Sequence, residues 1–111
     1  MTCIAQQRQA CLEAWINCEN LLSGLAHSDD NYGRHWQKVV DECALICMET
    51  WEAIKARSGQ MKKLMILCIG ICEECAEMCE RYEEAWFLQC AKSCRRCANS
   101  IARFAKASVY N

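Results

Sequence analysis

Cysteine recurs along this chain at intervals of three and four residues, in rows that cover several helical turns. Steps of three and four place side chains on one face of an α-helix. A helix normally carries Leu, Ile and Val on the face that packs against its neighbours. Thiols in these positions therefore predict a helical protein with a sulfur-lined interior. The rows are Cys43 and Cys47; Cys68, Cys72, Cys75 and Cys79; and Cys90, Cys94 and Cys97.

The remaining pattern favours an all-α fold, because the chain has no proline and its apolar residues repeat with the helical period. We expect helices at about residues 2–25, 34–57, 60–82 and 84–108, separated by short loops. Four helices of similar length with short loops predict an antiparallel up-down-up-down four-helix bundle with a cysteine-lined interior. The length of 111 residues suits a single domain over residues 1–111.

Antiparallel stacking, at about 1.5 Å of rise per residue, brings eleven of the twelve cysteines into one stretch of this interior. Cys3 falls at the other end, beside an expected apolar plug. The residues of this plug are Ile54, Leu64, Met65, Ile101 and Phe104. The thiols fall on three levels that run away from the plug: Cys11, Cys47, Cys68 and Cys97; then Cys18, Cys43, Cys72, Cys75 and Cys94; and last Cys79 and Cys90.

We expect these thiols to be reduced. Cysteines three or four apart on a helix have Cβ atoms about 5–6 Å apart, whereas a disulfide needs about 3.5–4.5 Å. Disulfide scaffolds are also rich in turns, and this chain has four glycines and no proline. In the alternative interpretation, the cysteines pack as small hydrophobic residues in a structural or partner-binding bundle. That alternative suits one or two cysteines better than eleven.

Thiolates are soft ligands that select soft metals, and two thiolates one helical turn apart suit a low-coordinate ion such as Cu(I). We therefore expect several Cu(I) ions per chain, bound by all eleven cysteines and admitted at the end nearest Cys79 and Cys90. Zinc is an alternative, although structural zinc sites usually gather four ligands from loops or knuckles. An iron–sulfur cluster is another, because Cys72, Cys75 and Cys79 imitate part of a ferredoxin motif that normally ends in Cys-Pro.

Charge and composition exclude several other functions. The net charge of −1, from 13 basic and 14 acidic side chains, gives no electrostatic reason to bind nucleic acid or an anionic membrane. No apolar run approaches the length of about 20 residues that spans a membrane. The N-terminus lacks the apolar stretch of a secretory signal, so we expect a cytoplasmic protein. No Ser/His/Asp or Cys/His arrangement suggests catalysis, and we expect no enzymatic activity.

Two histidines and two methionines could add ligands at the edge of the thiol interior. His27 and His35 lie in or beside the first expected loop, where the simpler interpretation is exposure to solvent. Met48 and Met78 could supply thioether ligands, although methionine on a bundle helix usually serves packing.

The segment ICEECAEMCERYEEAWFLQCAKSCRRCANS, residues 71–100, resembles the cysteine-rich four-helix-bundle copper storage proteins, in particular their cytosolic branch. Cysteines of the third and fourth helices carry the resemblance, and Cys68 extends it. The matching positions are Cys72, Cys75, Cys79, Cys90, Cys94 and Cys97. The resemblance implies a homotetramer of bundles that stores many Cu(I) ions inside each bundle.

The chain departs from this family at aromatic positions. Trp15, Trp51 and Trp86 stand one helical step from a cysteine, where the repeat would place another cysteine. Tyr82 stands where the family often has histidine. We expect the three indoles to narrow the interior and lower its metal capacity, and Trp36 to lie at the entrance.

Overall fold

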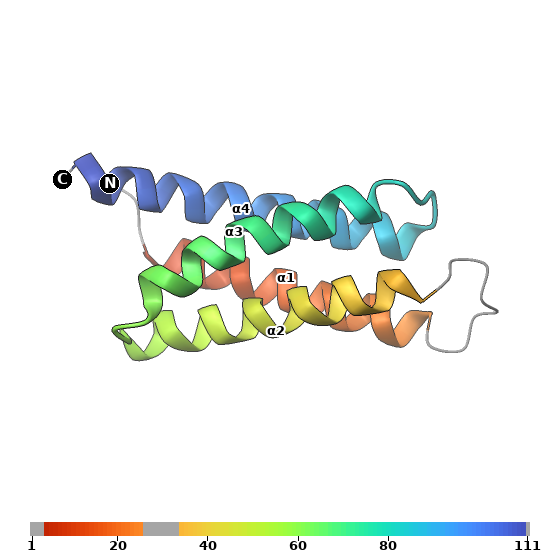
Figure 1. Cartoon of the computed structure of the whole chain (residues 1–111), viewed down its shortest axis with the longest axis horizontal. Helices are drawn as coiled ribbons and strands as arrows, with labels where there is room; N and C mark the ends of the chain where they lie inside the picture. The colour runs from red at the N-terminus through yellow and green to blue at the C-terminus, as the bar shows by residue number, and fades with distance from the viewer. Residues whose placement is uncertain (1–3, 26–33, 111) are drawn as a thin grey trace.

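The computed structural model describes residues 4–25 and 34–110, with the side chains described as far as residue 105. It contains four α-helices: α1 Ile4–Gly24, α2 His35–Ala56, α3 Met61–Cys79 and α4 Ala85–Tyr110 (Figure 1). Figure 1 shows the end of α1, the start of α2 and the α3–α4 connection at one end of an elongated bundle, with the α2–α3 connection, the start of α1 and the end of α4 at the other. We call these the loop end and the terminal end.

The helices form a ring around a central axis. Each helix packs against the next one in the chain, and α4 closes the ring against α1. Within the described residues, the backbones of neither diagonal pair of helices approach each other closely, so the axis is filled by inward-pointing side chains, such as Cys43 of α2 and Cys94 of α4, whose sulfur atoms lie 3.6 Å apart. The expected all-α four-helix bundle is confirmed. Among the described helices, none has an apolar stretch long enough to cross a membrane.

Local hydrogen bonds explain the two tight connections. At the end of α2, Arg57 adopts the left-handed conformation, with φ of 53°. Its N–H donates to Ile54 O, and the Ser58 N–H donates to Ala53 O, which is the Schellman pattern. Between α3 and α4 the sequence offers no Gly or Pro, and here the Glu84 carboxylate accepts a hydrogen bond from the Trp86 N–H at 3.1 Å.

The inward face of α1 differs from the expected one. Ala14 and Leu21 are buried there, while Trp15 is only partly buried. Ala14 and Trp15 each lie three or four residues from Cys11 and from Cys18, so the cysteine spacing allows either residue on the inner face. The small alanine side chain fits there between the closely spaced thiols. Trp15 instead packs at the side of the bundle against Trp51, with ring centroids 6.1 Å apart.

The predicted narrowing of the interior by three indoles is therefore wrong. Trp15 and Trp51 pack against the core from outside, and the Lys55 ammonium lies 5.0 Å from the Trp51 ring. Trp86 is 42% exposed and lies against Gly24, where an added Cβ would come within 2.8 Å of the indole. The interior is consequently lined by small side chains along most of its length.

Aromatic side chains close the loop end. Trp36 and Phe87 are both buried, and their rings meet edge to face with centroids 5.2 Å apart. Tyr82 stacks on Phe87 at 4.2 Å. Together with the buried Leu21 and Val40, these rings cap the thiol row. The end at which ions were expected to enter is thus sealed by the described residues, and Trp36 is part of the seal.

The terminal end is less apolar than the sequence predicted. Ile54, Met65 and Ile101 are buried as expected, while Leu64 and Phe104 are only partly buried. Three buried polar side chains, those of Gln7, Thr50 and Ser100, share this region. The Gln7 amide donates to Ser100 Oγ and O, at 3.1 and 3.3 Å, and the Thr50 hydroxyl donates to Ile46 O at 2.6 Å.

Candidate metal centre

Eleven cysteines line the axis of the bundle, and each is a free thiol with no exposed surface. The structure brings together all of the cysteines that the sequence pointed to as ligands, whereas Cys3 and His27 lie outside the described residues. All four helices contribute: Cys11 and Cys18 from α1; Cys43 and Cys47 from α2; Cys68, Cys72, Cys75 and Cys79 from α3; Cys90, Cys94 and Cys97 from α4.

The thiols nearest the terminal end form cluster 1, whose sulfur atoms all lie within 4.8 Å of one another. Its members are Cys47, Cys68, Cys72 and Cys97. The shortest contact joins Cys47 and Cys72 at 3.5 Å, and Cys68 lies 3.9 Å from Cys97. Cys11 extends this cluster toward Gln7, since it accepts a hydrogen bond from Cys97 at 3.8 Å. Cluster 1 thus joins α2, α3 and α4, and Cys11 adds α1.

Two further clusters continue the row toward the loop end. Cluster 2 consists of Cys18, Cys43, Cys75 and Cys94, and cluster 3 of Cys75, Cys79 and Cys90. Cys75 belongs to both clusters. Further short contacts join the groups, with Cys43 3.9 Å from Cys72 and Cys18 3.7 Å from Cys90. The three levels of thiols expected from helix stacking agree with these clusters, except that Cys72 belongs to cluster 1 and not to the middle level.

This arrangement favours several ions over one closed site. Four sulfur atoms within 4.8 Å would also suit a tetrahedral zinc ion. An isolated structural zinc site has four ligands of its own, whereas Cys75 serves two clusters and short contacts connect all three. A continuous row of soft ligands suits low-coordinate soft ions that bridge between sulfur atoms. The row can therefore hold several metal ions along its length.

Hydrogen bonding among the thiols splits their acidities within clusters 1 and 2. The pKa of Cys97 is lowered to about 7, chiefly by hydrogen bonding with Cys11 and Cys47. The pKa values of Cys68, Cys43 and Cys94 are also lowered by neighbouring thiols. A thiolate that accepts S–H donors is stabilised, and its donors hold their protons more firmly. Each four-thiol cluster therefore has two members that ionise readily.

The other thiols hold their protons at neutral pH. Hydrogen bonding with Cys68 and Cys97, followed by burial, raises the pKa of Cys11. For Cys79, the hydrogen bond with Cys75 lowers the pKa, but the bond with Cys90 and burial outweigh it, so the pKa is raised. Metal binding requires deprotonated thiols, so uptake must release protons from these positions.

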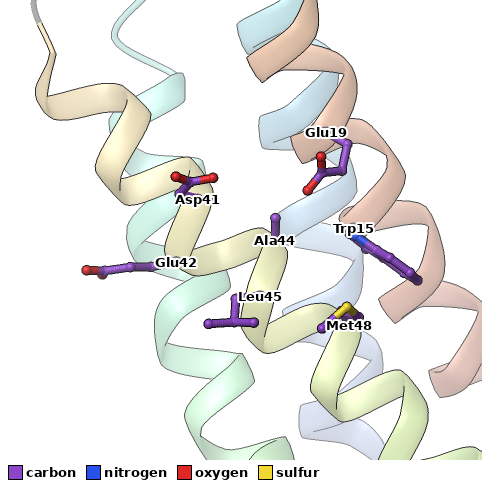
Figure 2. Close-up of a pocket in the computed structure, with 7 residues that line it drawn as sticks. All are labelled: Trp15, Glu19, Asp41, Glu42, Ala44, Leu45 and Met48. Carbon is purple, nitrogen blue, oxygen red and sulfur yellow. The ribbon is translucent and has the colours of Figure 1, made fainter.

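Sequence reasoning placed Trp36 at the entrance but missed the rest of the aromatic seal. It did not single out Phe87, although Phe87 lies three residues before Cys90 and so shares the inward face of its row. Two surface grooves beside the thiols also went unnoticed. One holds Met48 between α1 and α2 (Figure 2), and the other holds His35 and Met78 between α2 and α3.

The geometry can be compared with known proteins. A family model described as "Csp: Copper storage protein" matches residues 1–106. An uncharacterized cysteine-rich protein of Bacillus subtilis (strain 168), YhjQ, is 30% identical over 105 residues, which cover 90% of this chain and 97% of that protein. The solved structure of the Cu(I)-bound copper storage protein BsCsp3 superposes with a TM-score of 0.81 at 28% identity, covering 87% of this chain and 92% of the other.

Proposed function

Because this chain belongs to the copper storage protein family, we propose that it stores or buffers Cu(I), holding several ions on cysteine thiolates inside the bundle. The observation that carries the proposal is the row of three connected thiol clusters on the bundle axis. The proposed ligands are the eleven buried cysteines, with no part in catalysis. The similarity to a Cu(I)-bound neighbour supports copper as the ion.

The chemistry of the row suits cuprous storage. Each Cu(I) that replaces a thiol proton leaves the charge of the interior unchanged, so a dry interior can accept many ions without accumulating charge. In clusters 1 and 2, thiols that ionise easily lie beside thiols that stay protonated. The ionised members provide thiolate ligands for the first Cu(I) ions. Burial of every described thiol keeps bound copper away from water and from small oxidants.

An anaerobic titration of the reduced protein with Cu(I), against a competing chelator, tests this function. We expect several ions per chain, and fewer in Cys72→Ser, because Cys72 contacts both Cys47 and Cys43. Ala76→Ser is the matched control, since Ala76 is also buried on α3 and the change adds a hydroxyl without removing a thiol. One ion or fewer per chain would contradict storage. Iron with labile sulfide in fixed ratio would favour the iron–sulfur alternative.

We also propose that the protein acts in the reducing cytoplasm as a homotetramer, as its resemblance to the cytosolic branch implies. The exposed apolar side chains on several helices are consistent with association. They include Ile16, Leu45, Ile66, Leu67 and Leu88. Light scattering of the reduced protein should give about four times the chain mass of 12.7 kDa, and a monomer mass at all concentrations would contradict the assembly.

A further inference from the structure

A storage interior must exchange ions with its surroundings, yet every described thiol is shielded from solvent. Trp36, Phe87 and Tyr82 seal the loop end, nearest to cluster 3. The terminal end is filled by buried side chains that include Gln7 and Ile101. An incoming ion therefore has to pass through the wall between two helices or displace one of these seals.

One surface groove has ligands suited to this passage. It lies between α2 and α3, close to the loop end, and has a volume of about 160 Å³. We call it the α2–α3 groove. Its lining residues are His35, Val39, Glu74, Glu77, Met78 and Arg81. The α3 members Glu77 and Met78 follow Glu74 by three and four residues, so the three share one face of that helix, and Arg81 lies just after the helix ends.

Met78 connects this groove with the interior. Its side chain lines the groove and is also part of the buried core, with 7% exposure. It is adjacent in sequence to Cys79 and three residues from Cys75, both of which belong to cluster 3. Val39, which is also 7% exposed, lies beside it. Met78 and Val39 thus form the floor that separates the groove from the core.

We propose that the α2–α3 groove is a transfer site for Cu(I), at which the Met78 thioether and the His35 imidazole hold an incoming ion before it reaches cluster 3. This inference depends on the proposed storage function. Thioether and imidazole ligands both suit copper. The lining contains two exposed carboxylates, Glu74 and Glu77, against one guanidinium, Arg81, so its net charge favours cations. His35 is exposed at the start of α2, where a donor of copper can reach it.

The transfer is a ligand exchange without electron transfer. The Cu–Sδ bond to Met78 and the Cu–N bond to His35 break as a Cu–Sγ bond forms to Cys79 or Cys75. The thiol proton is released to water, and copper remains in the +1 state.

The groove between α1 and α2 offers a natural comparison (Figure 2). It is larger, at about 380 Å³, and its lining contains a thioether and three carboxylates but no imidazole. Figure 2 shows Trp15 and Glu19 on α1 across from Asp41 and Met48 on α2. Met48 follows Cys47 of cluster 1 and Glu19 follows Cys18 of cluster 2, so this groove flanks clusters 1 and 2 rather than cluster 3. It shares the methionine and the negative charge of the proposed site and lacks the nitrogen ligand.

Stopped-flow uptake of Cu(I) from a colorimetric chelator complex, followed to completion, tests the proposal. We expect the double variant His35→Gln/Met78→Leu to load more slowly by about tenfold or more, a rate effect of about 1.4 kcal/mol, with an unchanged final number of ions. Met48→Leu, which removes the thioether of the other groove, should load at the wild-type rate. Glu74→Gln/Glu77→Gln, at exposed positions, should slow uptake at low salt and less at high salt.

The outcomes separate this proposal from the storage function. Wild-type rates in the His35→Gln/Met78→Leu variant, or equal slowing in Met48→Leu, would overturn the transfer site while the ion count still reports storage. An equal loss of capacity and rate would make Met78 a part of the store and also overturn the proposal. Should Met78→Leu not fold, His35→Gln alone decides the question, because the exposed imidazole contributes nothing to the core.

Discussion

Loading the reduced protein with Cu(I) is expected to raise its melting temperature by tens of degrees. Each ion bound only by the folded state adds about 4 kcal/mol when free Cu(I) exceeds its dissociation constant a thousandfold. For a domain of this size, about 1 kcal/mol shifts the midpoint by about 4–8 °C. Several ions acting on clusters that join all four helices therefore give a very large effect. Anaerobic calorimetry at increasing Cu(I) equivalents measures it.

The control for this experiment is the same titration with Zn(II). If the thiols act as a row of bridging ligands, the midpoint should continue to rise with each Cu(I) added beyond the second. A rise that stops after one equivalent, or a larger rise with Zn(II), would indicate a closed tetrahedral site instead. Cys72→Ser should reduce the total rise, and Ala76→Ser should keep most of it.

The metal-free protein is expected to lose stability steeply above about pH 9, where the thiols of the unfolded chain ionise. Seven thiols have a raised pKa in the folded protein and stay protonated through this range. Four have a lowered pKa and are ionised in both the folded and the unfolded state above about pH 9, so they do not offset this loss. The seven are Cys11, Cys18, Cys47, Cys72, Cys75, Cys79 and Cys90. The four are Cys43, Cys68, Cys94 and Cys97.

Unfolding at high pH releases protons from the buried thiols. Above pH 9 the folded state binds more protons than the unfolded state, so the free energy of unfolding falls as pH rises. Each proton of difference contributes about 1.4 kcal/mol per pH unit. Anaerobic urea unfolding at several pH values from 7 to 10 measures the slope. In the copper-loaded protein the folded state has no thiol protons to lose, so the free energy of unfolding should rise with pH up to about 9 and then level off. A metal-free protein equally stable at pH 7 and 10 would contradict the raised pKa values.

The spacing of cysteines was enough to predict where most of the thiols lie. Steps of three and four fix a helix face regardless of context, and Cys68, Cys72, Cys75 and Cys79 are all buried on the inner face of α3. The same spacing could not choose between Ala14 and Trp15. Both positions satisfy the period between Cys11 and Cys18, and only packing against α2 decides that the alanine faces inward and the indole stacks beside Trp51.

By itself, then, the sequence determined an all-α bundle, the helix faces that carry thiols and the family to which the chain belongs, because these depend on local periodicity and residue type. Only the tertiary structure decided which thiols form a cluster. Each helix has its own axial shift and rotation in the bundle. These offsets place Cys75 in two clusters and Cys11 beside cluster 1. The same shifts bring Trp36 onto Phe87 and place His35 and Met78 in one groove. These offsets arise from packing between residues distant in sequence, which no local pattern records.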